Sequence, residues 1–436
     1  MSDDNQIMKE VTSLLTSLIR IKTENPPGIE TPAAEFLYNF LSKEGFEPEF
    51  LESSEDRGSV IAGLSGPGAR SLLLLSHLDV VPATPRGWSV DPFSGIVKDG
   101  FVWGRGAQDC KGLVAMEALA LARLKREGFK PKGKLIFAAT ADEETGGKAG
   151  AGWLVDNYPD KVRTEMLINE GGGEALPIYG KNHYLVQVAE KGVYWIRLGT
   201  IGTPGHASRP WLGDNALLKM CSIVEKLGTY HAPEETLDLV QNFVSKIDGG
   251  GSSANPKTLL DRAEKIGKTE FEMTKAMLRM TIVPTVMKAG VKANIIPDEA
   301  EAVVDCRLLP GQDLSYLKEH FKKALGSLEG LEMEPISDET GTISQHDTKL
   351  FRVIEDLVSK ADPGSICVPF MGLGATDSRY FRRKFGTVAY GFVPMKMDLP
   401  LEVFMKLPHG TDERISQNNL VYGTKFLVDL VRTILG

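Results

Sequence analysis

Four side chains that could bind metal ions stand at the ends of short apolar segments or just before a helical run, close to glycines: His77, Asp109, Glu144 and Glu170. They offer imidazole and carboxylate groups but no thiolate, a ligand set that suits zinc, cobalt or manganese rather than a cysteine-rich structural site. Two cations at about 3.5–4 Å need a bridging carboxylate, which a site with three carboxylates can supply. A base beside a metal-activated water would then give hydrolysis.

Each of these residues, taken alone, has a simpler interpretation. A histidine after a strand is often only a loop residue, and Glu143 with Glu144 could form a solvated turn. Asp109 could cap the helix that follows it, which is a common role for aspartate. These coincidences would all have to occur in one region, however, and the neighbouring glycines allow a close approach of the backbone. Cys110 is expected to point away from Asp109 as a packed free thiol.

The elements that must position these side chains alternate between strand and helix. Four short apolar runs between turn signals are typical of buried strands, at residues 60–64, 72–75, 134–139 and 166–168. A helical run with an apolar face spans 113–125. This alternation predicts an α/β fold, with a sheet flanked by helices on both faces. Because ligands bind beyond the carboxyl ends of strands in open α/β sheets, the acids and histidine are expected to converge on one sheet edge.

The pattern changes near residue 190, where a second domain is expected. Strands and helices follow in the order β-α-β-β-α-β, which could form a small ferredoxin-like α+β domain. The expected elements are strand 193–198, helix 215–227, strands 281–287 and 300–308, helix 316–325 and strand 331–336, with an exposed loop at 248–253. Buried patterns of the first kind return near 343. The sequence therefore predicts a discontinuous catalytic domain, 1–189 and 343–436, interrupted by an inserted domain, 190–342.

Composition excludes several classes of protein. A formal net charge of −8 and an isoelectric point near 5.6 give no footprint for nucleic acid or an anionic membrane. No stretch approaches ~18 consecutive apolar residues, so no transmembrane helix is expected. The four widely spaced cysteines and the acidic N-terminus predict a cytoplasmic protein with reduced thiols. The glycine-rich nucleotide motifs, G-x-S-x-G and H-E-x-x-H are absent from the sequence.

Eight short segments, spread over nearly the whole chain, carry a more specific pattern. They are Ser76–Pro82, Gly104–Gly112, Asp142–Gly147, Gly205–Ser208, Asn294–Pro297, Asp305–Arg307, Gly374–Asp377 and Pro408–Glu413. In this order and spacing they resemble the co-catalytic zinc amidohydrolases, the family of acetylornithine deacetylase, succinyl-diaminopimelate desuccinylase, aminoacylase, glutamate carboxypeptidase and carboxypeptidase S. The resemblance implies a zinc-peptidase-like catalytic domain with an inserted lid and dimerisation domain.

The resemblance also implies a role for each matching ligand. Asp109 would bridge two divalent metal ions, with zinc expected first and cobalt or manganese as alternatives. His77 and Glu170 would complete one metal site, and Glu144 and His409 the other. His409 lies more than 200 residues from the other ligands, and local pattern by itself indicates only a loop histidine there.

Further roles implied by the resemblance concern the reaction itself. Glu143 would be the general base, which takes a proton from water and delivers it to the leaving amine. Asp79 would orient the imidazole of His77. His206 would stabilise the oxyanion, in family members often from the partner subunit.

Three residues of the resemblance are expected to bind substrate. Arg307 and Asn294 would contact it, because a guanidinium fork suits a carboxylate held bidentately. Gly374 could offer backbone N–H groups to the same carboxylate. Two simpler interpretations stay open: Arg307 could only pair with an acid on its strand, and Asn294 could only stabilise its turn. A homodimer formed through the inserted domain is expected.

The expected reaction is hydrolysis of the amide bond of an N-acyl amino acid. In this family a glutamate at the position of Glu170 is more often found in deacylases, and an aspartate in peptidases. Residues 277–297, in contrast, resemble the carboxypeptidase S branch. A metallo-dipeptidase or carboxypeptidase acting on a short peptide is therefore the alternative. A non-catalytic scaffold and a pure substrate-binding protein are disfavoured, because every expected ligand and the base Glu143 are present.

Overall fold

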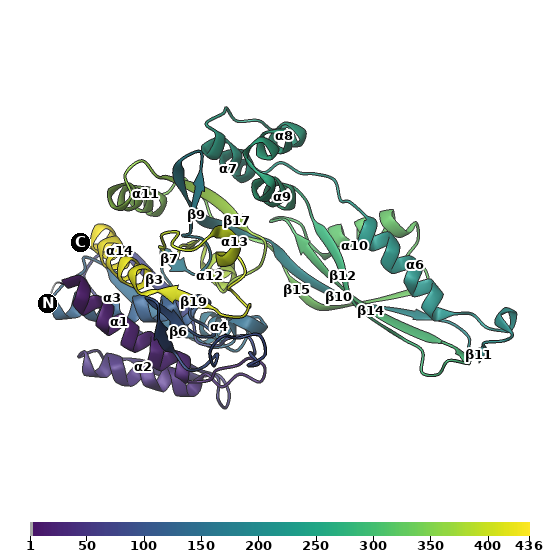
Figure 1. Ribbon diagram of the computed structural model, residues 1–436, viewed down its shortest axis with the longest axis horizontal. Helices are drawn as coiled ribbons and strands as arrows, with labels where there is room; N and C mark the ends of the chain where they lie inside the picture. The colour runs from purple at the N-terminus through teal and green to yellow at the C-terminus, as the bar shows by residue number, and fades with distance from the viewer. Residues whose placement is uncertain (1–2) are drawn as a thin grey trace. The chain divides into compact units, whose positions relative to one another are not determined.

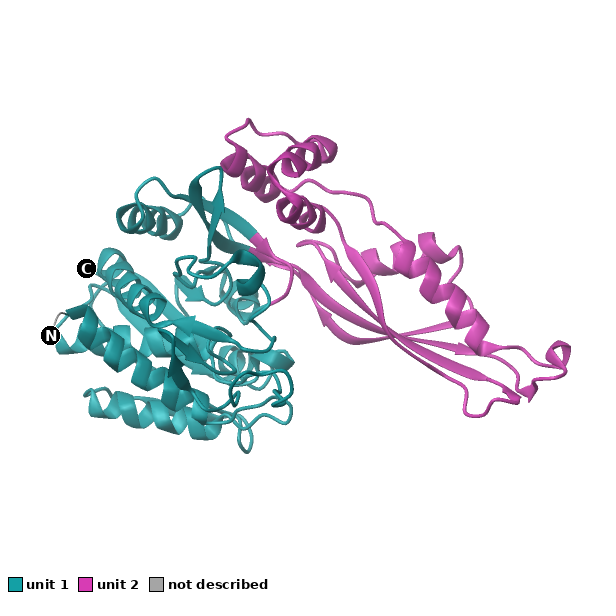
Figure 2. Ribbon diagram, viewed as in Figure 1, with its two compact units in different colours: residues 1–188, 344–370, 376–436 teal, residues 189–343, 371–375 magenta. Residues whose placement is uncertain are grey.

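The computed structural model describes residues 3–436 of the chain. The chain forms two compact units (Figure 2). Unit 1 comprises residues 1–188, 344–370 and 376–436, and unit 2 comprises residues 189–343 and 371–375. The insertion predicted at 190–342 lies within unit 2, which also takes up the short segment 371–375.

A mixed sheet of ten strands forms the centre of unit 1, in the order β1-β2-β6-β3-β7-β18-β9-β16, with β8 and β17 also paired with β9. The strands are β1 (Glu49–Glu52), β2 (Gly58–Ser65), β3 (Ser71–His77), β6 (Lys134–Thr140), β7 (Met166–Asn169), β8 (Ala175–Ile178), β9 (Lys181–Glu190), β16 (Thr342–Ile343), β17 (Ile366–Gly372) and β18 (Val388–Gly391). Neighbours β6, β3, β7 and β18 run parallel. Their carboxyl ends therefore meet at one sheet edge.

Helices cover both faces of this sheet (Figure 1). The helices of unit 1 are α1 (Asp3–Arg20), α2 (Thr31–Lys43), α3 (Lys111–Arg126), α4 (Ala151–Asn157), α5 (Pro159–Val162), α11 (Lys349–Ala361), α12 (Ser378–Phe385), α13 (Leu401–Phe404) and α14 (Gln417–Leu435). Leu73 and Leu75 pack in one cluster with Leu154 of α4 and Phe381 of α12, whereas α3 and α14 contact β3 from the helical layer that they form with α1. Burial on both faces explains why β3 is continuously apolar rather than alternating. The predicted α/β fold is confirmed.

A separate three-stranded sheet, in the order β19-β5-β4, completes unit 1. Its strands are β4 (Ile96–Lys98), β5 (Phe101–Trp103) and β19 (Arg414–Ser416). The pairing of β5 with β19 is antiparallel and joins segments about 300 residues apart, with Trp103 opposite Arg414.

Unit 2 contains a four-stranded antiparallel sheet in the order β12-β14-β10-β15. Its strands are β10 (Gly192–Ile201), β12 (Thr281–Ala289), β14 (Glu299–Leu308) and β15 (Leu331–Glu339). Two helices, α6 (Ala216–Thr229) and α10 (Leu314–Leu325), pack on one face of this sheet (Figure 1). Alternate residues of β10, Tyr194, Ile196 and Leu198, point into that core, as the two-residue period of a half-buried strand requires. A two-residue ribbon pairs β11 (Gly205–His206) with β13 (Ile295–Ile296).

Three further helices of unit 2 were not predicted from the sequence: α7 (Asp238–Asp248), α8 (Pro256–Ile266) and α9 (Lys268–Met277). They pack on one another, with Val240, Phe243 and Val244 of α7 buried. Of the exposed loop expected at 248–253, residues 249–253 lie between α7 and α8, whereas Asp248 is the last residue of α7. Within residues 3–436, no helix is both long and apolar enough to cross a membrane.

Candidate metal centre

Parallel pairing in unit 1 brings three of the predicted site segments to the same sheet edge. β3 ends at His77, β6 ends at Thr140 just before Glu143 and Glu144, and β7 ends at Asn169 just before Glu170. Because β3 lies between β6 and β7, the histidine is flanked by the two acidic segments. The expected convergence of these side chains follows directly from this strand order.

The small sheet of unit 1 brings the other two predicted ligands together. β5 leads into the segment that carries Asp109, and the segment that carries His409 leads into β19. Antiparallel pairing of β5 with β19 therefore places the two segments side by side, and the Gly104 N–H donates to the Glu413 carbonyl at 2.9 Å. Asp109 does not cap α3, whose N-cap is Cys110 and whose start has no side-chain cap.

The two carboxylate oxygens of Asp109 face two different histidines. Asp109 Oδ1 lies 3.2 Å from His77 Nε2, and Asp109 Oδ2 lies 2.9 Å from His409 Nε2. A second carboxylate accompanies each imidazole: Glu170 Oε2 lies 3.4 Å from His77 Nε2, and Glu144 Oε2 lies 3.1 Å from His409 Nε2. The five predicted ligands thus form two groups that share one carboxylate, the arrangement that two neighbouring cations require.

Charge and hydrogen bonding in this cluster favour bound cations. One Glu144 oxygen, Oε1, is buried without a hydrogen-bond partner, and ligand atoms of His77, Asp109 and Glu144 all lie within 4.8 Å of one another. Burial raises the pKa of Glu170 to about 7 and also raises the pKa of Glu143. Burial therefore disfavours the ionised form of these closely spaced carboxylates. Divalent ions bound between them would supply the positive charge that stabilises it. The residues therefore fit a pair of divalent metal ions.

The predicted base Glu143 is held through its backbone by Asp79. Asp79 Oδ1 accepts the Glu143 N–H at 3.1 Å, and Oδ2 accepts the Glu144 N–H at 3.0 Å. The same carboxylate lies 3.3 Å from His77 Nδ1. Burial pushes the pKa of Asp79 upward, but its contacts with His77 hold that pKa below the usual range. One buried carboxylate therefore orients both the imidazole of His77 and the turn that bears Glu143.

Two supporting residues escaped the sequence reasoning. Asn25 is buried, and its amide donates to Asp79 Oδ2 at 2.8 Å and to Thr145 Oγ1 at 3.0 Å. Its only local signal is the Pro-Pro turn that follows it. Glu413 is also fully buried and accepts backbone N–H groups of the Asp109 segment. Glu413 lies in the segment Pro408–Glu413, one of the eight that resemble the family, but the resemblance assigned no role to it.

Cys110 is a free and fully buried thiol, as expected. Its sulfur accepts the His77 N–H at 3.2 Å. It also lies within 4.8 Å of the imidazole of His77 and the carboxylate of Glu170, so the thiol lines the candidate metal centre.

The remaining predicted site residues belong to unit 2. His206 and Asn294 meet at the β11–β13 ribbon, where the Ala207 N–H donates to the Asn294 carbonyl at 3.1 Å. Arg307 holds Asp305 bidentately, with Nε–Oδ1 at 2.6 Å and Nη2–Oδ2 at 2.9 Å. The simpler interpretation of Arg307, a pairing with an acid on its own strand, is thus observed here. A Cβ built on Gly374 meets only open space.

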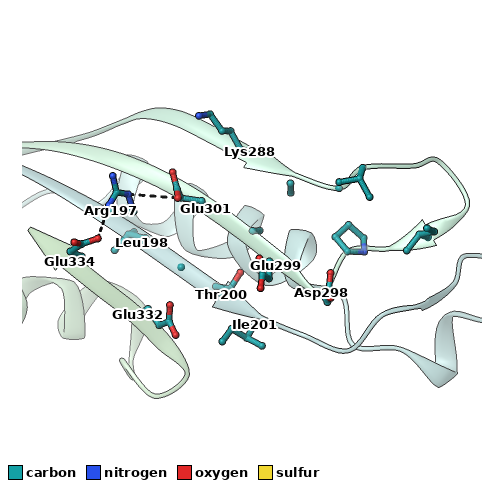
Figure 3. Close-up of a pocket in the computed structure, with 17 residues that line it drawn as sticks. Arg197, Leu198, Thr200, Ile201, Lys288, Asp298, Glu299, Glu301, Glu332 and Glu334 are labelled. Carbon is teal, nitrogen blue, oxygen red and sulfur yellow. Dashed lines mark hydrogen bonds and ion pairs between the residues drawn. The ribbon is translucent and has the colours of Figure 1, made fainter. Parts of the chain in front are cut away.

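Unit 2 also has a hollow of about 600 Å³ on its sheet (Figure 3). Its lining is rich in acids, and Arg197 lies between Glu334, at 2.6 Å, and Glu301, at 3.7 Å. None of the predicted site residues lines this hollow.

Comparison with known proteins identifies relatives along most of the chain. It is 28% identical over 389 residues to the human N-fatty-acyl-amino acid synthase/hydrolase PM20D1, covering 84% of this chain and 75% of that protein. It is 26% identical over 384 residues to a probable succinyl-diaminopimelate desuccinylase of Staphylococcus aureus, covering 86% of each. The fold is similar to the structure of an M20 family metallo-carboxypeptidase, Sso-CP2 from Sulfolobus solfataricus, with a TM-score of 0.77, 17% identity and coverage of 100% and 99%.

A protein-family model matches residues 73–433, which include every predicted site residue. Peptidases and amidohydrolases of this family hydrolyse peptide or amide bonds, and the five-ligand cluster supplies a possible metal site for that chemistry. The chain therefore belongs to Peptidase family M20/M25/M40 and is a metal-dependent hydrolase of amide or peptide bonds.

Proposed function

We propose that the protein hydrolyses the amide bond of N-acyl amino acids at a dinuclear metal centre, most favourably zinc. His77 and Glu170 would hold one ion, Glu144 and His409 the other, and Asp109 both. The division of the two Asp109 oxygens between the two imidazoles carries this proposal. A site for a single ion would not need both oxygens of one carboxylate to face separate histidines.

When bound, two divalent ions polarise the scissile carbonyl and lower the pKa of a water molecule beside them. Glu143 acts as general base, accepting the proton of the attacking water and passing it to the leaving amine. Desolvation raises the pKa of Glu143 above that of an ordinary glutamate, which makes its carboxylate a stronger proton acceptor. Asp79 keeps this carboxyl in position through the backbone.

Four residues of unit 2 are proposed to take part in the reaction: His206, Asn294, Arg307 and Gly374. Nδ1 of His206 accepts the Ser208 N–H at 3.2 Å, which leaves the ring proton on Nε2, as donation to an oxyanion requires. Arg307, Asn294 and Gly374 are proposed to bind the substrate carboxylate, with Arg307 exchanging Asp305 for it. Pairing of two chains through unit 2 is proposed as well, and sedimentation equilibrium tests it.

The names of the relatives support the N-acyl substrate class, since they include an N-fatty-acyl-amino acid synthase/hydrolase and a probable desuccinylase. A dipeptidase or carboxypeptidase remains the second candidate, because a probable carboxypeptidase S-like protein of Dictyostelium discoideum is 28% identical over 379 residues, covering 83% of this chain and 71% of that protein. Both reactions cleave the same type of bond and release an amino acid as the leaving amine; they differ in the group on the carbonyl side, which is a simple acyl group in one and an aminoacyl or peptidyl group in the other.

A substrate panel separates the two candidates. The zinc-reconstituted protein is assayed on N-acetyl, N-succinyl and N-fatty-acyl amino acids beside matched dipeptides. We expect higher kcat/KM on an N-acyl series, and activity on dipeptides alone would reject the deacylase proposal. Glu143→Gln should lower kcat by about 10²–10⁴-fold, whereas the exposed control Glu47→Gln should match the parent.

A further inference from the structure

Helix α12 holds the turn that follows Glu143. The carbonyl of Gly146 accepts two side-chain hydrogen bonds, from Arg379 Nη2 at 2.6 Å and from the Tyr380 hydroxyl at 2.5 Å. The N–H of Gly146 in turn donates to the Glu143 carbonyl at 2.9 Å. Gly146 therefore connects the side chains of Arg379 and Tyr380, through hydrogen bonds, to the backbone of Glu143.

The two side chains are themselves tightly fixed. The ring of Tyr380 packs against Gly147 and Gly152 so closely that a Cβ at either glycine would lie 2.9 or 2.8 Å from a ring carbon. The Arg379 guanidinium lies 4.7 Å from the centre of this ring and also donates to the Thr376 carbonyl at 2.6 Å. Arg379 is 3% exposed. Both donors thus have one available arrangement, which suits a fixed support rather than a transient surface contact.

The turn of Glu143 is consequently held on both sides by different parts of unit 1. On its amino side, Asp79 accepts the N–H groups of Glu143 and Glu144. On its carboxyl side, Arg379 and Tyr380 hold Gly146. A general base must keep its geometry within about 0.5 Å to act well, and the contacts of Gly146 fix the end of the turn that Asp79 does not touch.

We propose that Arg379 and Tyr380 are positioning residues for Glu143, which fix the base from α12 without touching substrate. This inference rests on the proposed function, since it assigns them to the reaction that Glu143 serves. Because substrate binding would not depend on them, their loss should lower kcat and leave KM unchanged.

The test compares Tyr380→Phe, Arg379→Met and the double variant in the zinc-reconstituted enzyme. Tyr380→Phe removes one hydroxyl and keeps the ring between its two glycines, so it preserves packing. We expect kcat to fall by about 10- to 100-fold in the double variant, with KM and bound metal as in the parent. Arg379→Lys should recover part of the loss, because it restores a donor. Arg383→Met, an exposed change on the same helix, serves as the matched control and should keep parental kcat.

Two further measurements separate positioning from general destabilisation. In a Glu143→Gln background, the double variant should cause no additional fall in kcat, because there is no base left to position. Hydrogen–deuterium exchange of a peptide covering residues 142–150 should be faster in the double variant and parental in Arg383→Met. The inference would be overturned if the double variant showed parental hydrogen exchange or parental kcat. It would also be overturned if the fall in kcat persisted in the Glu143→Gln background or accompanied a loss of bound metal. The exchange result stands even if the parent hydrolyses no N-acyl amino acid, so the two proposals can fail separately.

Discussion

Replacing Glu413 by glutamine should destabilise unit 1 severely, because this buried carboxylate ties two distant segments together. Its Oε1 accepts the N–H groups of Gln108, at 2.8 Å, and Asp109, at 3.1 Å. Its Oε2 accepts Arg105 Nη1, at 2.7 Å, and the Gly106 N–H, at 3.1 Å. Burial raises the pKa of Glu413, but all four neighbours donate, so a proton on this carboxyl would have no acceptor and the group stays ionised.

The magnitude follows from this count of donors. Whichever way the amide of glutamine is turned, its NH₂ group replaces one oxygen and faces two donors. Two hydrogen bonds to a charged group are lost, at about 1.5–3 kcal/mol each. Breaking a buried ion pair costs about 3–5 kcal/mol by itself, and Arg105 is 4% exposed. We therefore expect Glu413→Gln to lower the free energy of unfolding by about 3–5 kcal/mol, a large part of the about 5–15 kcal/mol typical of a folded protein.

Urea unfolding of the metal-free protein at pH 7, followed by tryptophan fluorescence, measures this change. Trp88 is a suitable reporter, since the Arg105 guanidinium lies 5.4 Å from the centre of its ring. The exposed control Glu47→Gln should change the free energy of unfolding by less than about 0.5 kcal/mol. A loss below about 1 kcal/mol in Glu413→Gln would refute the reasoning. In the folded variant, metal affinity should also fall by about 10- to 100-fold, because Glu413 orients the Asp109 segment.

Three further predictions concern pH, the Asn25 support and the metal ions. Burial lowers the pKa of Lys191 to about 7 from 10.5, so between these pH values the unfolded chain binds more protons than the folded one and the free energy of unfolding should rise with pH. In urea unfolding, Lys191→Met should lose part of this pH dependence, whereas the exposed control Lys292→Met should keep it. Asn25→Ala, which removes a donor to Asp79, should lower kcat by about 10- to 100-fold; parental steady-state kinetics would contradict this. Chelation should lower Tm in calorimetry and zinc should restore it, since ligands that bind only the native state stabilise it; an unchanged Tm would argue against a bound metal.

Local pattern was sufficient for the part of the site that lies on parallel strands. The apolar runs that became β3, β6 and β7 are buried on both faces, so they read as strands without alternation. Their acids and histidine come immediately after the last apolar residue, and parallel neighbours end at the same edge. Convergence of His77, Glu144 and Glu170 could therefore be predicted from sequence order and strand type alone.

Other features could not be predicted from local pattern, for physical reasons specific to each. The packing of α7, α8 and α9 on one another is one such feature. The helices themselves carry a local signal that was overlooked, since Val240, Phe243 and Val244 are spaced as on one helix face, but that spacing does not specify which partner the face packs against. In this structure the guanidinium of Arg307 binds Asp305. The sequence could not decide between this ion pair and substrate binding, because the aspartate and the expected substrate both offer a carboxylate.

The sequence by itself determined which chemistry this protein can perform: its ligand types, its base and the family pattern are all properties of residues and their order. Only the tertiary structure decided how the two proposed metal sites arise from them. Antiparallel pairing of β5 with β19 brings His409 to Asp109 across about 300 residues, so the two oxygens of one carboxylate face two imidazoles. The two segments are joined by long-range backbone hydrogen bonds and by the hydrogen bonds of the buried Glu413, and neither leaves a periodic signal along the chain.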